Sequence, residues 1–345
     1  MVDFGGWDMP VQYSGILDEH HAVRRAVGIF DVSHMGEIEI HGPDALRLVN
    51  RVSTNEAARL RNGQAHYSAL LYEHGGFVDD ILVHRVSSDR YFLCVNAANQ
   101  EKDAAHIQAY NTFDATVEDA SARYAQIAVQ GPRALQTLQK LTAVFLSALR
   151  YYHFADAELA GVPTRIARTG YTGEDGCELY LPPSSAERIW QQILDAGAEF
   201  GIKPCGLGAR NTLRLEAKMA LYGNEINASI TPWEADLAWI VKLDKDDFIG
   251  RAALLAQKER GVTRKLAGFE MLGRGIARDG YEISIEGAGA GWVTSGGPAP
   301  TLGKNIGLGY LPVKVAEPGR AIQVMVRGQL VDARTVATPF YRRTK

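Results

Sequence analysis

The chain has 345 residues, of which 46% are hydrophobic and 22% charged, with a formal net charge of −3 at pH 7. These values are typical of a globular enzyme of two or three domains, and they exclude an extended basic surface for nucleic acid. The three cysteines, Cys94, Cys177 and Cys205, lack metal-ligand spacing and suit a reducing compartment. No apolar run is long enough to span a membrane, and the first residues lack a signal-peptide pattern. We therefore expect a cytoplasmic enzyme that holds no metal and binds neither nucleic acid nor membrane.

The first third of the chain predicts helices and strands that alternate. An amphipathic helix is expected over residues 15–27, and a half-buried strand follows, in which Ile38 and Ile40 alternate with glutamates. A proline then opens a second helix. Residues 65–95 predict three strands joined by short turns, and residues 96–110 predict a helix. This order favours α+β packing, with helices on one face of a mostly antiparallel sheet.

The middle and the last third of the chain differ in character. A second α+β pattern covers residues 122–225, and its clearest helix is expected at 184–201, where Ser184 and Glu187 match a capping box. Beyond it, short strands separated by glycine-rich turns predict a small β-barrel or sandwich. The run GAGAGW, residues 287–292, lacks the strand-to-helix setting of a dinucleotide site, so we expect a hairpin turn there.

Two adjacent carboxylates stand at the centre of the predicted strand GGFVDDILVH, residues 75–84. Because side chains alternate between the faces of a strand, Asp79 and Asp80 should point in opposite directions. Both faces are largely apolar, so at least one carboxylate is expected in a partly dehydrated site with a raised pKa. Such a group suits acid–base catalysis or the stabilisation of a developing cation. A structural carboxylate bonded to the Gly75–Gly76 turn or to an arginine explains this stretch alone at least as well.

A second candidate is the glycine-rich segment RTGYTGEDGCELY, residues 168–180. Its glycines permit tight turns or the close approach of a flat ligand, and Tyr171 offers a ring face and a hydroxyl. Glu178 follows in a predicted strand and is able to accept two parallel N–H bonds from an amidine-like edge. A glycine-rich hairpin with a solvated glutamate is the alternative.

A third candidate is CGLGARNTLRLEAKMALYG, residues 205–223, which predicts a buried helix that begins near Asn211. Arg210 would then stand at the helix N-terminus, where free N–H groups and the helix dipole favour an anion such as a ligand carboxylate. An ion pair with an aspartate of the same domain is the alternative for Arg210. We expect Arg214 and Glu216, further along the helix, to pair inside the protein.

The histidines add no site to these candidates. His20, His21 and His34 lack the i, i+4 spacing of a helical metal pair, so ordinary surface or core positions are expected for them. The sequence also lacks a nucleophile elbow, a P-loop and an HExxH element.

Taken together, these segments resemble the glycine cleavage system T-protein family, the tetrahydrofolate-dependent aminomethyltransferases, over nearly the whole chain. The resemblance rests on many motifs in fixed order, among them MVDFGGWDMPVQY, IFDVSHMGEIEIHGPDA, GGFVDDILV, VNAANQEKD, RTGYTGEDGCELY, GLGARNTLRLEA and the closing PFYRR. It implies a three-domain, cloverleaf-like folate-binding fold of two α+β domains and a C-terminal β-barrel domain. The implied domains are residues 1–38 with 121–226, residues 39–120, and residues 227–345.

The resemblance also implies a reaction. Members of the family take the aminomethyl group from the lipoyl arm of the H-protein, release ammonia and form 5,10-methylenetetrahydrofolate. Tetrahydrofolate is therefore expected as co-substrate and the lipoylated H-protein as partner, in the bacterial cytoplasm or in the mitochondrial matrix of a eukaryote. Two relatives with the same fold are alternatives, a folate-dependent demethylase and a non-catalytic folate-binding iron–sulfur assembly factor. The latter typically carries a KGCxxGQE-like segment, whereas this chain has LEAKMALYGNEI and no cysteine there.

Site residues carry over from the family by position. The second aspartate of GGFVDDI matches the catalytic carboxylate, which assigns catalysis to Asp80 and a structural role to Asp79. Glu178 matches a folate-binding glutamate, Arg210 a substrate-contacting arginine, and Tyr341 a C-terminal contact. Three further positions line the folate site of the family: Tyr67, Asn96 and Tyr171.

The sequence departs from the family pattern in two places. Family members usually read GLGARD where this chain has GLGARN, so Asn211 keeps the capping capacity but not the carboxylate. Family members also usually carry further residues ahead of the segment that matches MVDFGGW.

Overall fold

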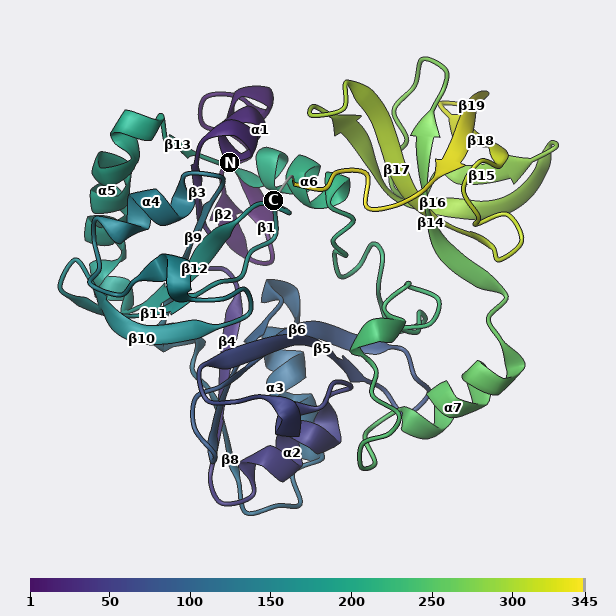
Figure 1. Ribbon diagram of the computed structural model, residues 1–345. Helices are drawn as coiled ribbons and strands as arrows, with labels where there is room; N and C mark the ends of the chain where they lie inside the picture. The colour runs from purple at the N-terminus through teal and green to yellow at the C-terminus, as the bar shows by residue number, and fades with distance from the viewer. Residues whose placement is uncertain (344–345) are drawn as a thin grey trace.

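The structure, a computed structural model, describes residues 1–343 and forms three lobes around a common centre (Figure 1). Two lobes combine helices with a sheet, and the third is a closed barrel near the C-terminus. The α+β fold with a C-terminal barrel expected from the sequence is therefore confirmed. The domain limits themselves stay a prediction. Among residues 1–343, no helix is both long enough and apolar enough to cross a bilayer.

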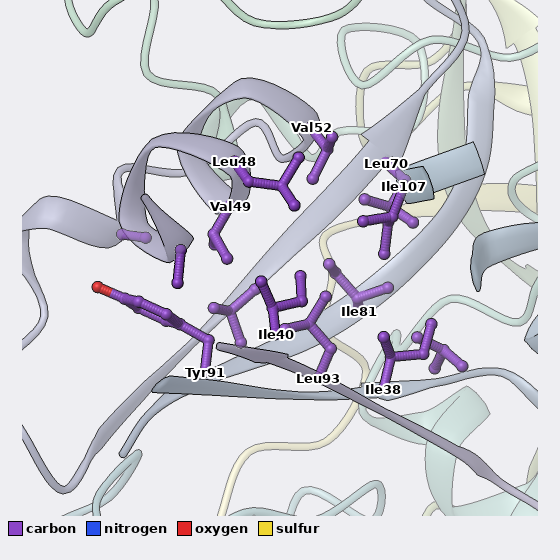
Figure 2. Close-up of a cluster of buried hydrophobic side chains, with 14 of the residues drawn as sticks. Ile38, Ile40, Leu48, Val49, Val52, Leu70, Ile81, Tyr91, Leu93 and Ile107 are labelled. Carbon is purple, nitrogen blue, oxygen red and sulfur yellow. The ribbon is translucent and has the colours of Figure 1, made fainter. Parts of the chain in front are cut away.

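The lobe at the bottom of Figure 1 is a five-stranded antiparallel sheet covered on one face by α2 and α3. The strand order is β5-β6-β7-β4-β8. Figure 2 shows its core, in which Leu48 and Val49 of α2 face Ile40 and Leu93 of the sheet. The element bounds are β4 (Gly36–His41), α2 (Ala45–Val52), β5 (Gln64–Leu71), β6 (Phe77–Arg85), β7 (Arg90–Val95), α3 (Gln100–Ala109) and β8 (Thr116–Asp119).

The prediction that β4 is half-buried was wrong. Glu37 and Glu39 are buried, as are Ile38 and Ile40. The second face of the strand is covered as well, and Tyr124 and Arg90 donate hydrogen bonds to the Glu39 carboxylate. Buried glutamates are tolerated where such partners replace water.

The second lobe contains a six-stranded sheet in the order β10-β11-β12-β9-β3-β13. All neighbouring pairs are antiparallel except β3 with β13. Since β3 and β9 are neighbours, the chain leaves this lobe after β3 and returns to it at β9. The element bounds are α1 (Ile16–Arg25), β3 (Gly28–Asp31), β9 (Ala125–Gln130), α4 (Ala134–Gln139), β10 (Phe154–Leu159), β11 (Val162–Ala167), β12 (Gly176–Leu181), α5 (Ala186–Gly197), β13 (Lys203–Pro204) and α6 (Leu207–Glu216).

The capping box predicted for α5 does not form. The helix begins at Ala186 with Ser185 as N-cap, and no side chain bonds to the cap. A 3₁₀ turn over Pro183–Ser185 precedes the helix and takes in Ser184, which moves the start of the helix away from the expected position. The buried stripe of α5 does contain Ile189 and Ile193, as helical spacing predicts.

The third lobe is a six-stranded barrel that closes through pairing of β14 with β19. A hairpin turn forms at the start of the GAGAGW run, where Glu286 and Gly287 are both at positive φ, but the remaining residues of the run, 288–292, belong to a strand. The element bounds are β14 (Arg264–Met271), β15 (Glu282–Ile285), β16 (Ala288–Ala299), β17 (Lys304–Pro312), β18 (Ala321–Val326) and β19 (Gln329–Val336). Elsewhere lie β1 (Val2–Phe4), β2 (Trp7–Met9), α7 (Arg251–Arg260) and the 3₁₀ helices η1 (Ala57–Arg59), η2 (Ala97–Asn99), η3 (Ser121–Arg123), η4 (Leu146–Ala148), η5 (Pro183–Ser185), η6 (Ala198–Phe200) and η7 (Ala238–Ile240).

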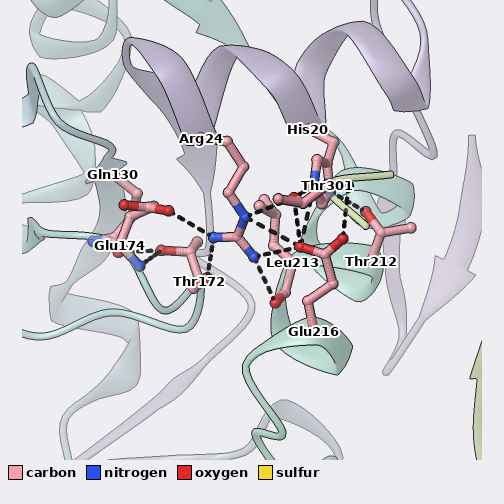
Figure 3. Close-up of polar contacts among 9 residues, drawn as sticks. All are labelled: His20, Arg24, Gln130, Thr172, Glu174, Thr212, Leu213, Glu216 and Thr301. Atoms are coloured by element: carbon pink, nitrogen blue, oxygen red, sulfur yellow. Dashed lines mark hydrogen bonds and ion pairs between the residues drawn. The ribbon is translucent and has the colours of Figure 1, made fainter. Parts of the chain in front are cut away.

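A buried polar network joins the second lobe to the barrel (Figure 3). Arg24 of α1 pairs with Glu216 at 2.9 Å and with Glu174 at 3.0 Å. The barrel residue Thr301 donates its backbone N–H to Glu216 and its hydroxyl bonds His20 at 2.8 Å. Because His20, Arg24 and Glu216 are buried and paired, their bonds to Thr301 fix the orientation of the barrel against α1 and α6.

Candidate active site

Asp79 and Asp80 lie on β6 directly after a β-bulge. The register between β5 and β6 shifts there, which leaves Val78 without an opposite residue. A bulge bends a strand and changes the direction of the side chains beside it. Asp79 is fully buried, whereas Asp80 is only partly buried and faces away from the helices of its lobe. The two carboxylates therefore occupy different environments, as the alternation of side chains predicts.

Asp80 receives two hydrogen bonds through its carboxylate. The Tyr67 hydroxyl donates to Oδ2 and the Asn96 side-chain amide donates to Oδ1, both at 2.7 Å. Burial, followed by the negative charge of Asp79, raises the pKa of Asp80 to about 7, while the two donors oppose that rise. Within residues 1–343, Asp80 forms no ion pair and no bond to the Gly75–Gly76 turn. It is therefore a carboxylate that pairs with no lysine or arginine in the part of the chain that the structure describes.

Asp79 has the contacts of a structural residue. Its oxygens accept hydrogen bonds from the Asn96 backbone N–H at 2.9 Å, the Asn96 amide at 2.8 Å and the Asn99 amide at 2.6 Å. These bonds tie β6 to the turn that follows β7. Asn99 was not predicted as part of the site. The only sequence feature that points to Asn99 is its position three residues after Asn96, in the turn that opens a helix.

Tyr171 and Arg210 form a stacked pair. The Arg210 guanidinium lies 4.5 Å from the centre of the Tyr171 ring, and the Tyr171 hydroxyl donates to the Ala220 carbonyl at 2.5 Å. Arg210 forms no ion pair within residues 1–343, so the alternative of an internal aspartate partner does not hold there. Burial lowers the pKa of Arg210. An arginine cation held over a ring without a carboxylate partner is suited to an anionic ligand.

Glu178 lies on β12 and is buried. The hydroxyl of Thr169 donates to its Oε2, and Glu178 has no ion pair in the part of the chain that is described. Burial raises the pKa of Glu178, while the Thr169 bond and the charge of Arg210 lower it. Its carboxylate therefore has acceptor positions that no side chain of the described residues occupies besides Thr169.

The prediction that Arg210 stands at a helix N-terminus was wrong. Helix α6 begins at Leu207 instead of near Asn211, and its first N–H groups donate to the backbone carbonyls of Pro10 and Val11. The loop after β2 therefore satisfies the groups that were expected to bind an anion. Any anion would instead be held by the Arg210 side chain itself.

A cavity of about 350 Å³ lies beside the Tyr171–Arg210 pair, and both residues line it. Phe4 of β1 and Ser295 of β16 line it too, so it is bounded by the N-terminal hairpin, by α6 and by the barrel. Within residues 1–343, Asp80 and Glu178 are not among the residues that line this cavity. The charge of Asp80 does help to raise the pKa of Tyr171, which is about 12 chiefly through burial. The Tyr67 ring lies 5.7 Å from that of Trp239, an exposed residue that was not predicted to belong to the site.

The structure places Tyr341 at the interlobe network rather than beside Asp80. Arg24 stacks 3.9 Å above its ring, and its backbone N–H donates to the Glu216 carbonyl at 2.8 Å. Burial and then the neighbouring Glu174 raise the pKa of Tyr341 to about 12. Of the predicted site residues, Asp80, Tyr67 and Asn96 form one bonded group, and Tyr171 with Arg210 forms a second. Glu178 belongs to neither group, although its charge and that of Arg210 act on each other's pKa.

His34 is fully buried, as a core histidine should be, but neither ring nitrogen has a hydrogen-bond partner within residues 1–343. Burial and then the charge of Arg210 lower the pKa of His34 to about 3, so the ring is neutral. Across the same residues, no group of three or more His, Cys, Asp or Glu side chains is arranged to hold a metal ion.

Comparisons with family models and with known proteins all indicate the same family. The model of the GCVT N-terminal domain matches residues 1–245, and the model of the glycine cleavage T-protein C-terminal barrel domain matches residues 264–342. The chain is 53% identical to an aminomethyltransferase of Acidobacterium capsulatum over 351 residues, covering 100% of this chain and 93% of the relative. It is 51% identical to an aminomethyltransferase of Desulfitobacterium hafniense over 344 residues, covering 99% and 94%.

A solved structure agrees with these relatives. The crystal structure of the glycine cleavage system aminomethyltransferase T from Bartonella henselae is similar with a TM-score of 0.93 and 33% sequence identity. The match covers 100% of this chain and 95% of that chain. The likeness therefore extends over all three lobes.

Proposed function

The chain belongs to the glycine cleavage T-protein family and is an aminomethyltransferase, and we propose that its reaction is centred on Asp80. The family uses tetrahydrofolate. The donor in the proposed reaction is the aminomethyl group on the lipoyl arm of an H-protein. The acceptor is tetrahydrofolate bound between Asp80, Glu178 and Arg210.

The observation that carries the proposal is the state of Asp80. Its carboxylate is oriented by two neutral donors and is paired with no lysine or arginine in residues 1–343. A carboxylate that is paired with a cation is largely neutralised and stabilises positive charge on a substrate only weakly. An oriented carboxylate without such a partner stabilises positive charge that develops beside it. With a pKa of about 7, a substantial fraction of Asp80 is ionised at neutral pH.

The chemistry requires such a group at one step. N5 of tetrahydrofolate forms a bond to the aminomethyl carbon as the bond from that carbon to the lipoyl sulfur breaks. When ammonia then leaves, the carbon held on N5 becomes iminium-like and electron-poor, and Asp80 stabilises the charge until N10 forms the second bond to the carbon. The two protons lost by N5 and N10 balance the ammonia and the dihydrolipoyl thiol that are released. A fixed carboxylate in a site that excludes water stabilises this charge better than bulk water does.

The remaining site residues bind and orient the folate. Glu178 offers acceptor positions to the N–H edge of the pterin, since only Thr169 occupies it in the described chain. Arg210, held over Tyr171, takes the anionic end of the folate. Tyr341 contributes from the C-terminal segment by holding Arg24, although its own contact with substrate rests on the family resemblance alone.

The direct test supplies aminomethyl-loaded H-protein and tetrahydrofolate and measures ammonia and 5,10-methylenetetrahydrofolate together. We expect ammonia and 5,10-methylenetetrahydrofolate in equal amounts. In a control at low enzyme concentration without tetrahydrofolate, neither product should form. Transfer of a methyl group from a sulfonium or methylamine donor would favour a demethylase instead. Folate binding without any product would favour a non-catalytic scaffold.

A further inference from the structure

A buried carboxyl lies behind the active site and takes no part in the chemistry proposed above. Asp103, in the first turn of α3, is fully buried, and neither of its carboxyl oxygens has a hydrogen-bond partner within residues 1–343. An ionised carboxylate in this position would place two anionic oxygens in a dry core without donors, which is strongly unfavourable. A protonated carboxyl is neutral and needs only one acceptor for its O–H group.

Asp79 has an acceptor position to offer. A carboxylate offers about four acceptor positions, and the three donors from Asn96 and Asn99 leave one position of Asp79 unused. Asp103 follows Asn99 by one helical turn, so both side chains lie on the face of α3 that packs on β6. Asn99 reaches Asp79 Oδ1 at 2.6 Å from that face, so the Asp103 side chain one turn later is directed toward the same carboxylate.

We propose that Asp103 is a protonated carboxylic acid that donates a hydrogen bond to Asp79, and that this acid–carboxylate pair is a positioning unit for Asp80. The link to Asp80 is the Asn96 amide nitrogen, which lies 2.8 Å from Asp79 Oδ1 and 2.7 Å from Asp80 Oδ1. Asp79 therefore holds the donor that orients the catalytic carboxylate. The inference rests on the proposed function of Asp80.

Charge sharing is the second consequence of the pair. With Asp103 protonated, the Asp79–Asp103 pair carries one negative charge instead of two, and that charge is spread by four hydrogen bonds. Two full charges behind Asp80 would oppose its ionisation much more strongly, because like charges raise the pKa of a carboxyl. The pair thus leaves Asp80 able to ionise near neutral pH.

The other charged and titratable groups around the pair agree with this assignment. On α3, Lys102 directs its ammonium to Asn99 Oδ1 at 2.8 Å and to the Tyr222 hydroxyl at 3.0 Å, and so does not pair with Asp103. His106, one turn further along, is neutral, because burial lowers its pKa to about 4. Burial, followed by the charge of Asp79, raises the pKa of Asp103 to about 11. Tyr222 has a pKa raised to about 12 and is also neutral.

The experiment compares three variants of the full chain. Asp103→Asn keeps an N–H donor of nearly the same shape, Asp103→Leu fills the space without a donor, and Glu101→Gln changes an exposed carboxylate on the same helix turn as a control. Infrared difference spectra at neutral pH, wild type minus Asp103→Asn, report the carbonyl band of a protonated carboxyl without any need for activity. Steady-state kinetics with aminomethyl H-protein give kcat across pH, and titration gives the Kd for tetrahydrofolate.

We expect the carbonyl band in the difference spectrum and expect it to be absent when Glu101→Gln is subtracted instead. Asp103→Asn should keep kcat within about threefold of wild type, whereas Asp103→Leu should lose about tenfold or more, the loss typical of one hydrogen bond to a charged group. In Asp103→Leu the acidic limb of the rate profile should also move to higher pH, while Kd stays within about threefold. The proposal is overturned if no band is seen, if Asp103→Asn loses as much as Asp103→Leu, or if Asp103→Leu keeps the wild-type kcat and profile. If the wild type does not form 5,10-methylenetetrahydrofolate, the proposed function is contradicted. The infrared spectra would still decide whether Asp103 is protonated.

Discussion

The hydroxyl of Tyr67 donates a 2.7 Å hydrogen bond to Asp80 from the neighbouring strand. Tyr67 is paired opposite Leu82, so its long side chain reaches Asp80 along the diagonal of the β5–β6 pair. The two strands therefore deliver the carboxylate and one of its orienting donors to the same face of the sheet. Neither residue depends on a loop for its position, which favours a rigid site.

Tyr67→Phe should shift the acidic limb of the rate profile to higher pH. A hydrogen bond to a carboxylate stabilises the charged form, and the Tyr67 bond lowers the pKa of Asp80 in the wild type. Since such a bond contributes about 1.5–3 kcal/mol and one pKa unit corresponds to about 1.4 kcal/mol, a shift of about one to two units is expected. The measurement is kcat between pH 5.5 and 9, a range chosen to bracket the pKa of about 7. An unchanged limb would mean that Asp80 does not set the acidic limb.

Arg210→Ala should weaken the binding of tetrahydrofolate or of the lipoyl-bound donor about tenfold or more, with little loss of stability. Its guanidinium has no ion pair in residues 1–343 to lose, only the stack on Tyr171. Isothermal titration with each substrate and thermal unfolding check the two parts of this prediction. Unchanged affinity for both substrates would remove Arg210 from the site.

Arg214→Ala provides the matched contrast, one helical turn further along α6. Arg214 is buried and pairs with Glu225 at 2.8 Å and with the Ser295 hydroxyl at 2.7 Å. These contacts agree with the internal pairing that was expected for Arg214. Its removal leaves a buried carboxylate without its partner, so the free energy of unfolding should fall by about 3–5 kcal/mol. Chemical denaturation of the two variants side by side should separate them clearly. Equal stability of the two variants would contradict the distinction.

Glu178→Ala should raise the Kd for tetrahydrofolate more than it lowers the rate of the bound complex. The carboxylate is proposed to hold the pterin edge and not to face the reacting carbon, so its loss affects the ground state and the transition state alike. Single-turnover rates at saturating folate, together with the folate Kd, separate binding from chemistry. A normal Kd with a slow single turnover would reverse the assigned role.

Tyr341→Ala should lower the stability of the protein by about 1–2 kcal/mol, the contribution expected of a partly buried cation–π contact. The ring covers the Arg24 guanidinium in the network that ties the barrel to α1. Tyr341→Phe keeps the ring and should retain most of the stability. Denaturant titration of both variants measures the difference. If the two variants lose equally, the hydroxyl and its neighbour Glu174 carry the stabilisation instead of the ring.

The sequence predicted the parts of the site that follow from local rules. Alternation along a strand placed Asp79 and Asp80 on opposite faces, and turn chemistry identified the hairpin at Gly287. Neither rule distinguishes a catalytic carboxylate from a structural one. That distinction came from the resemblance to a family, and the structure supports it with the contrast between three donors on Asp79 and a partly exposed Asp80.

Contacts between segments that lie far apart in the sequence could not be predicted from it. The start of α6 was predicted near Asn211 because nothing local shows that the carbonyls of Pro10 and Val11 cap the helix four residues earlier. The burial of Glu37 depends in the same way on a second covered face of β4. The burial of Asp103 in the first turn of α3 was likewise not predicted, because it depends on the packing of that helix and not on a local pattern.

The central claim is that the charge of Asp80 stabilises the electron-poor carbon, and Asp80→Asn tests it most directly. The amide is nearly isosteric and still bonds to Tyr67 and Asn96, but it carries no charge. Single-turnover formation of 5,10-methylenetetrahydrofolate from aminomethyl H-protein should fall at least about a hundredfold, which is the loss typical of one electrostatic contact to a transition state. The Kd for tetrahydrofolate should stay near the wild-type value, and Asp246→Asn, a change of an exposed aspartate, should have no effect. Near-normal turnover in Asp80→Asn would contradict the account.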